Sequence, residues 1–107
     1  MFYVYEFRDQ NGVPFYVGKG SKKRISAHEA KARRGIKSHF YNKLRKIWRD
    51  GFMHQKAIVF ETLFEEFAFE EEKRLLAYYG RENLTNQTDG GDGPSNPPAE
   101  VRAKIAA

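Results

Sequence analysis

The spacing of hydrophobic and polar positions at the start of the chain predicts a β-hairpin. Residues 2–7 are aromatic or β-branched apart from one glutamate, a composition that favours a strand. Asp9-Gln10-Asn11-Gly12 is turn sequence, and its Asn-Gly pair is the strongest short-range hairpin signal. Residues 14–18 then return as a second strand.

The hairpin sequence is compatible with two registers. If Asn11-Gly12 forms a two-residue turn, Phe7 faces Tyr16 across the hairpin, whereas a four-residue loop makes Tyr5 face Tyr16. Paired residues share a face of the sheet, and so do alternate residues along one strand. Either register therefore places Tyr5 and Tyr16 on the same face.

The central part of the chain predicts two helices. The first covers about residues 22–34, where Arg24 and His28 stand four apart on one face. Ser38 can cap the second, which runs through Asp50 and ends at Gly51. Its apolar stripe has helical spacing and consists of Phe40, Leu44, Ile47 and Trp48.

The remaining segments complete an α/β (α+β) domain with a small three-stranded antiparallel sheet. Residues 55–62 contain Ala57-Ile58-Val59-Phe60, which predicts a short buried strand. A third helix covers about residues 64–79 and stops at Gly80. The predicted order is β-β-α-α-β-α followed by a short C-terminal helix from residue 96. We expect a domain over residues 1–93 and a tail over residues 94–107.

Length and composition limit the class of protein. With 107 residues one domain is expected, and 16 aromatic residues supply a modest core. Zero cysteines exclude a disulfide framework, a thiol nucleophile and a zinc–thiolate site. No apolar run reaches the ~20 residues of a membrane span, and no signal peptide is evident. We therefore expect a soluble intracellular domain that does not contact a membrane.

The positive charge of the chain is concentrated in one segment. Residues 19–49 contain 12 Lys and Arg but a single acidic residue, Glu29. Such an excess favours binding of a phosphate backbone, because each neutralised phosphate releases condensed counterions. A solvated helix face would explain one short run, but not an excess across two predicted helices. The candidate nucleic-acid contacts are Lys19, Lys22, Lys23, Arg33, Arg34, Lys37 and Lys43.

The third predicted helix carries carboxylates where apolar residues are expected. Glu71 and Glu72 fall into a gap on the stripe formed by Phe64, Phe67, Ala68, Leu75, Leu76 and Tyr79. A carboxylate on the core-facing side needs a cation or a metal, because desolvating it alone is costly. Alternatively, one of the two lies at the edge of the stripe and reaches water. A metal ligand at this position is expected to lie in an open cleft.

The arrangement of these residues resembles the GIY-YIG nuclease domain. The paired motif corresponds to Tyr3-Val4-Tyr5 and Phe15-Tyr16-Val17-Gly18-Lys19-Gly20. The remaining motif positions follow in the family's order at Arg24, His28, Glu72 and Asn86. Tyr3 stands where the first motif has its eponymous glycine. The resemblance covers residues 2–93. The motif pattern is similar both to animal branched-DNA nucleases with ankyrin and LEM domains and to phage and bacterial nucleases, including restriction enzymes.

The resemblance implies a divalent-metal-dependent DNA endonuclease that hydrolyses phosphodiester bonds. Mg²⁺ is the implied cofactor, with Mn²⁺ as a substitute, and Glu72 is the implied metal ligand. Tyr5 would orient or deprotonate the water with His28 as its proton acceptor, although Tyr16 and Tyr5 could exchange roles. Arg24 would bind phosphate oxygens bidentately, and Asn86 would support the site by hydrogen bonding.

Several alternatives remain at this point. A catalytically silent nucleic-acid-binding module could use the same fold, and an RNA substrate is not excluded. The DNA could be double-stranded or branched, as in homing, phage-type or structure-selective nucleases. The segment from Asn96 to Ile105 resembles the start of a modular DNA-binding repeat associated with nucleases. The number of chains that act together is open.

Overall fold

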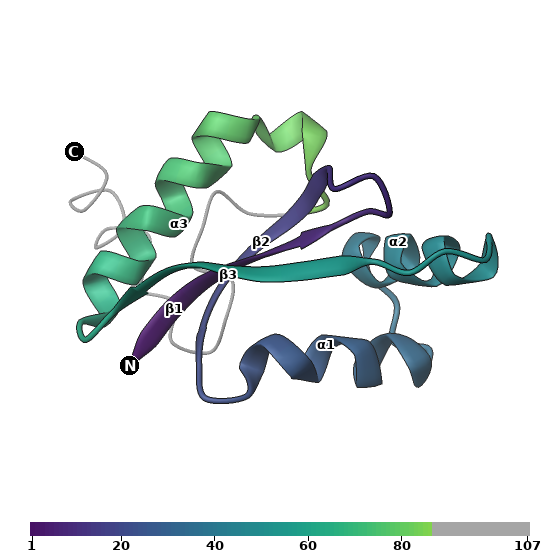
Figure 1. Ribbon diagram of the computed structural model, residues 1–107, viewed down its shortest axis with the longest axis horizontal. Coiled ribbons are helices and arrows are strands. Elements are labelled where there is room, and N and C mark those ends of the chain that lie inside the picture. Colours follow the sequence, from purple (N-terminus) through teal and green to yellow (C-terminus); the bar gives the residue numbers. More distant parts are fainter. Residues whose placement is uncertain (87–107) are drawn as a thin grey trace.

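The computed structural model describes residues 1–86 and has the predicted α+β order (Figure 1). The strands are β1 (Phe2–Arg8), β2 (Pro14–Ser21) and β3 (Gln55–Thr62). The helices are α1 (Arg24–Arg33), α2 (His39–Arg49) and α3 (Glu65–Tyr79), followed by a 3₁₀ turn at Arg81–Asn83. The predicted tail and its short helix lie outside the described residues. Within residues 1–86, no helix is long and apolar enough to cross a membrane.

The three strands form an antiparallel sheet in the order β2-β1-β3, with β1 in the centre. The hairpin loop differs from both predicted forms, because Asp9 and Val13 close a loop of three residues through a 2.9 Å backbone hydrogen bond. A β-bulge then shifts the register between Phe7 and Arg8, so that Phe7 pairs with Tyr16. The Phe7–Tyr16 pairing is thus one of the two predicted registers. That register is predicted with a two-residue turn, whereas the structure forms it with a three-residue loop and a bulge.

The helices cover the two faces of the sheet (Figure 1). The face toward α1 and α2 buries an aromatic cluster, whose β1 members are the alternate residues Tyr3, Tyr5 and Phe7. The opposite face packs against α3 and buries a smaller cluster that includes Val4 and Val17. The predicted common face of Tyr5 and Tyr16 is confirmed, since both belong to the first cluster.

The prediction that the third strand is buried is wrong. Ile58 and Val59 are 47% and 38% exposed, and the strand alternates only weakly between covered and open positions. The reason is the helices that cover it: both β2 and β3 are edge strands, but β2 packs against α1 and α3, whereas within residues 1–86 the only helix with substantial contact to β3 is α3. The short hydrophobic run correctly predicts a strand, but it does not predict how far the strand is buried.

The helix boundaries follow the predicted end signals. The Ser38 side chain accepts a 3.0 Å hydrogen bond from the Tyr41 backbone N–H at the start of α2. Gly51 and Gly80, with φ of 87° and 84°, follow the ends of α2 and α3. The apolar stripe of α3 is rotated from the predicted one: Phe64 and Phe67 are exposed. The buried side consists of Ala68, Phe69, Glu72, Leu75 and Leu76.

Candidate functional site

Tyr5 and His28 form a buried hydrogen-bonded pair at the centre of the aromatic cluster. The Tyr5 hydroxyl oxygen lies 2.5 Å from His28 Nε2, and the two residues are 0% and 5% exposed. β1 supplies the tyrosine and α1 the histidine, so the contact joins segments 23 residues apart. Tyr5 and His28 are therefore in direct contact in the folded protein.

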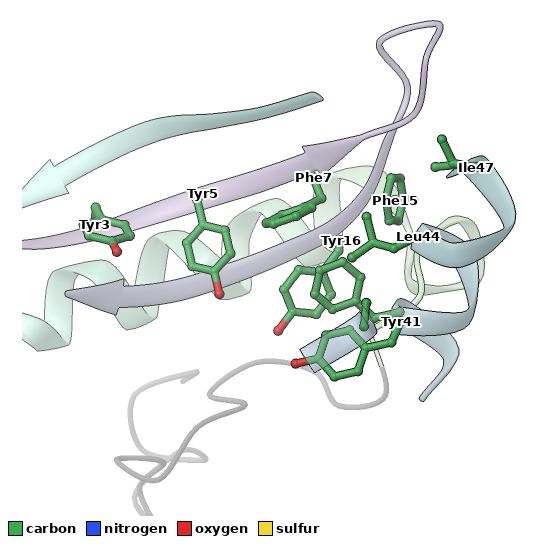
Figure 2. Packing of buried hydrophobic residues seen from close by; sticks show 10 residues of the cluster. Tyr3, Tyr5, Phe7, Phe15, Tyr16, Tyr41, Leu44 and Ile47 are labelled. Atoms are coloured by element: carbon green, nitrogen blue, oxygen red, sulfur yellow. The ribbon is translucent and has the colours of Figure 1, made fainter. Parts of the chain in front are cut away.

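Tyr16 of β2 lies on the same side of the sheet as Tyr5 (Figure 2). Its ring centroid is 6.2 Å from that of Tyr5 and 5.6 Å from that of His28. The ring stacks on Phe40 of α2 at a centroid distance of 3.8 Å and an interplanar angle of 4°. Packing against α2 thus fixes the second motif tyrosine next to the first.

The surroundings of the pair favour the neutral form of both partners. Burial raises the pKa of the Tyr5 hydroxyl well above its ordinary value of 10.0, although the nearby Arg24 guanidinium acts in the opposite direction. Burial, with the positive charges of Arg24 and Lys31, lowers the pKa of His28 from 6.5 to about 4. At neutral pH a phenol therefore faces an uncharged imidazole.

Arg24 and Glu72 bring opposite charges close to the Tyr5 hydroxyl, and the Glu72 carboxylate contributes to the raised Tyr5 pKa. Glu72 is fully buried, so the expected open cleft at this residue is not observed. Glu71 instead lies near the edge of α3 and forms a 2.5 Å ion pair with Arg74. Of the two carboxylates, Glu72 is the one that faces the interior.

The Glu72 carboxylate is suited to a metal ion that keeps most of its water ligands. Across residues 1–86, no group of three or more His, Cys, Asp or Glu side chains could enclose a metal. Carboxylate oxygen is the ligand type that Mg²⁺ takes from proteins, usually from one or two residues. The donor set therefore fits Mg²⁺ anchored by one carboxylate.

Asn86 holds the edge of β2 rather than approaching the tyrosine hydroxyls. Its Oδ1 accepts a 3.0 Å hydrogen bond from the Val17 N–H, and its Nδ2 donates a 2.7 Å bond to the Val17 carbonyl. Thr85 makes a similar pair of bonds to the Phe15 carbonyl. These contacts fix the backbone on both sides of Tyr16.

Tyr3 occupies the position at which the first GIY-YIG motif has glycine, and its side chain stabilises the turn that precedes Arg24. Its hydroxyl donates a 2.7 Å hydrogen bond to the Lys22 carbonyl and accepts a 3.1 Å bond from the Ile25 N–H. Lys22 has a φ of 54°, the left-handed region that costs energy for residues other than glycine. The Tyr3 bonds stabilise this backbone and the start of α1.

A cavity of about 230 Å³ opens beside the pair, and its wall includes Tyr16, Arg24 and His28. Lys31 and Tyr41 also line it, and neither is among the site residues expected from the sequence. The Tyr41 hydroxyl lies 2.9 Å from His28 Nδ1. No sequence signal distinguished Tyr41, because it adjoins an apolar stripe and reads as a core residue.

The candidate nucleic-acid contacts differ in their exposure. Five of them are exposed on α1 and the loops beside it, namely Lys22, Lys23, Arg33, Arg34 and Lys37. Lys43 is partly buried, with its ammonium 5.9 Å from the centre of the Phe15 ring. The Lys19 side chain is 6% exposed and forms a 3.0 Å ion pair with Glu65 of α3. Lys19 is therefore less available to a phosphate than the exposed residues.

A family model described as the LEM-3-like GIY-YIG domain matches residues 7–96. No curated protein and no solved structure matches the chain. The matched region contains Tyr16, Arg24, His28, Glu72 and Asn86, whereas the first motif lies just before it.

Proposed function

Since the chain belongs to the LEM-3-like GIY-YIG domain family and is a nuclease domain, we propose that it is a divalent-metal-dependent DNA endonuclease. Its substrate is double-stranded or branched DNA, cut by hydrolysis of a phosphodiester bond. The observation that carries the proposal is the 2.5 Å contact between the Tyr5 hydroxyl and His28 Nε2, beside a cavity lined by Arg24. A purely DNA-binding module would not need this buried proton-transfer pair.

Tyr5 and His28 act together on the attacking water. A phenol with a raised pKa is a poor base alone, so a proton acceptor must receive its proton as the water approaches. His28 is neutral at pH 7 and can take that proton through Nε2. Tyr16, on the same face, orients the water or the phosphate.

Arg24 binds and orients the scissile phosphate. Its guanidinium lines the cavity beside Tyr16 and His28, and it can offer two parallel hydrogen bonds to phosphate oxygens. Charge that builds up on those oxygens during attack is stabilised by a fixed cation in a partly dehydrated site. Asn86 keeps β2, and with it Tyr16, in place through the Val17 backbone.

Glu72 would hold the metal, which is Mg²⁺ with Mn²⁺ as a substitute. When bound, the ion stabilises negative charge on the phosphate and on the leaving oxygen. Among residues 1–86, the ligand that we assign to the ion is the Glu72 carboxylate, buried on α3 and close to Tyr5. Such a ligand leaves the other coordination positions to water and phosphate oxygens.

DNA lies along the exposed basic residues of α1 and its adjacent loops. These residues surround the Arg24 end of α1 and continue past its C-terminal end. Their charges attract the phosphate backbone without reading bases, since contacts to phosphate carry no sequence information. The basic surface therefore accounts for affinity, whereas the site accounts for cleavage.

Incubation with supercoiled plasmid, four-way junction DNA and matched RNA, each with Mg²⁺ or EDTA, tests the proposal. The expected result is metal-dependent cutting of DNA, and preference for plasmid or junction identifies the substrate form. Binding of DNA without any cutting in Mg²⁺ or Mn²⁺ would favour the silent module. Cutting of RNA alone would overturn the assignment of DNA as substrate.

A further inference from the structure

Tyr41 is placed to act on His28 from the side opposite to Tyr5. It lies in the first turn of α2, where the Ser38 cap accepts a hydrogen bond from its backbone N–H. The side chain is buried, and its hydroxyl is 2.9 Å from His28 Nδ1. His28 is therefore held between two tyrosine hydroxyls, one at each ring nitrogen.

The two contacts have different consequences for the two neutral tautomers of His28. A neutral imidazole carries one N–H and one lone pair, so it donates at one nitrogen and accepts at the other. If Nδ1 carries the hydrogen, it donates to the Tyr41 oxygen, and Nε2 accepts from the Tyr5 hydroxyl. If Nε2 carries the hydrogen, the directions reverse and His28 has no free lone pair toward Tyr5.

We propose that Tyr41 is a positioning residue that holds His28 in the Nδ1–H tautomer, so that Nε2 can receive the proton of Tyr5. The inference rests on the proposed function, in which Tyr5 and His28 are the proton-transfer pair. A hydroxyl can donate as well as accept, so the direction is set at the other nitrogen: the Arg24 guanidinium, which only donates, hydrogen-bonds the Tyr5 oxygen and leaves the Tyr5 O–H to donate to Nε2. Tyr41 is the residue whose hydroxyl contacts Nδ1.

The proton movements balance with this tautomer. The water gives a proton to the Tyr5 oxygen while the Tyr5 proton moves to His28 Nε2, so the tyrosine remains neutral. The hydroxide forms the new bond to phosphorus while the bond from phosphorus to the leaving oxygen breaks and that oxygen keeps the electron pair, and the positive charge is left on His28. Nδ1–H continues to donate to Tyr41, which holds the imidazolium in place until its Nε2 proton is released to solvent or to the departing oxygen.

The tautomer of His28 can be measured directly by ¹⁵N NMR of the ring nitrogens at pH 7, without metal or DNA. The parent protein is expected to show a protonated Nδ1 and an unprotonated Nε2. In Tyr41→Phe the hydrogen is expected to move to Nε2, and cleavage is expected to fall about ten-fold or more with DNA affinity in EDTA unchanged. Tyr78→Phe removes a hydroxyl from an exposed side chain and should change neither the His28 tautomer nor the cleavage rate.

Two results would overturn the inference. One is a parent protein with hydrogen on Nε2, a measurement that needs no variant to fold. The other is a folded Tyr41→Phe in which Nδ1 remains protonated, which would make Tyr41 a packing residue. Failure of the proposed function would look different: the parent would not cut nucleic acid, although the tautomer still changed in Tyr41→Phe.

Discussion

The ring of Tyr5 lies directly against the backbone of Gly18 on the neighbouring strand. A Cβ atom at position 18 would be 2.4 Å from Tyr5 Cζ and 2.5 Å from its hydroxyl oxygen. The two residues are cross-strand partners, so the glycine leaves the space that the tyrosine ring occupies. This contact gives a physical reason for glycine directly after Tyr16 and Val17.

Gly18→Ala is therefore expected to displace the Tyr5 ring from His28. Neither the Tyr5 ring nor β1 can move far in a packed cluster, so unfolding should become easier by about 1–3 kcal/mol. Cleavage should fall by more than about ten-fold, because the proton-transfer contact is lost. Denaturant unfolding and a plasmid-nicking rate measure the two effects. In a Tyr5→Ala background the added cost of Gly18→Ala should largely disappear.

Tyr5→Phe and Tyr16→Phe should each lower the cleavage rate by more than about ten-fold, since general acid–base help is worth about 10²–10⁴. Tyr5→Phe should also lower the free energy of unfolding. Tyr5→Phe leaves buried His28 Nε2 without its partner, which costs about 1–3 kcal/mol. Tyr78→Phe, at an exposed position, serves as the control for both measurements. If both site variants cut at the parent rate, the tyrosines are packing residues only.

The burial of His28 should make folding stability depend on pH. Its pKa is about 4 in the folded protein and 6.5 when unperturbed, so the unfolded chain binds more protons between these values. The free energy of unfolding should therefore fall as pH decreases from about 6.5 to 4, by on the order of 3 kcal/mol from this residue. His28→Gln should lack that component. Equal pH slopes for the two proteins would contradict the assigned burial of neutral His28.

The affinity for DNA should decrease steeply with salt, because the exposed basic residues displace counterions from phosphates. Replacing Lys22 and Lys23 together by Gln should weaken binding and reduce the log–log slope by about 2 if each contacts one phosphate. Lys46→Gln is the control, since its Nζ is 2.8 Å from Asp50 Oδ2 and already paired. An affinity for DNA that does not change with salt would exclude the basic surface as the binding site.

Much of the fold follows from short-range patterns in the sequence. The Ser38 cap and the stops at Gly51 and Gly80 define α2 and α3, because these signals act on backbone groups within a few residues. The common face of Tyr5 and Tyr16 follows from alternation in both predicted registers, although the observed three-residue loop keeps it only because of the bulge beside Phe7. Local backbone chemistry explains why these features could be predicted.

Other features depend on tertiary contacts that no short pattern encodes. The bulge beside Phe7 determines the register, and without it a three-residue loop would turn Tyr16 to the opposite face. The exposure of β3 depends on which helices pack against each edge strand of the sheet. Tyr41 acquires its contact with His28 only when α2 packs beside α1. These features required the folded arrangement.

Glu72 provides the sharpest distinction between a metal-dependent nuclease and a silent binding module. Glu72→Gln keeps the size of the side chain and removes its charge, and Glu71→Gln is a matched control one residue away. Glu71 is paired with Arg74 at the edge of the helix, so its loss should leave the site unchanged. Melting temperatures and DNA affinities in EDTA establish that both variants fold and bind.

The decisive measurement is the single-turnover rate of DNA cleavage in Mg²⁺ for the parent, Glu72→Gln and Glu71→Gln. Metal stabilisation of the transition state is worth several kcal/mol, so Glu72→Gln should cut at least about a hundred-fold more slowly than the parent. Glu71→Gln should cut at the parent rate. A Glu72→Gln protein that binds DNA and cuts as fast as the parent would contradict the assignment of Glu72 as the metal ligand.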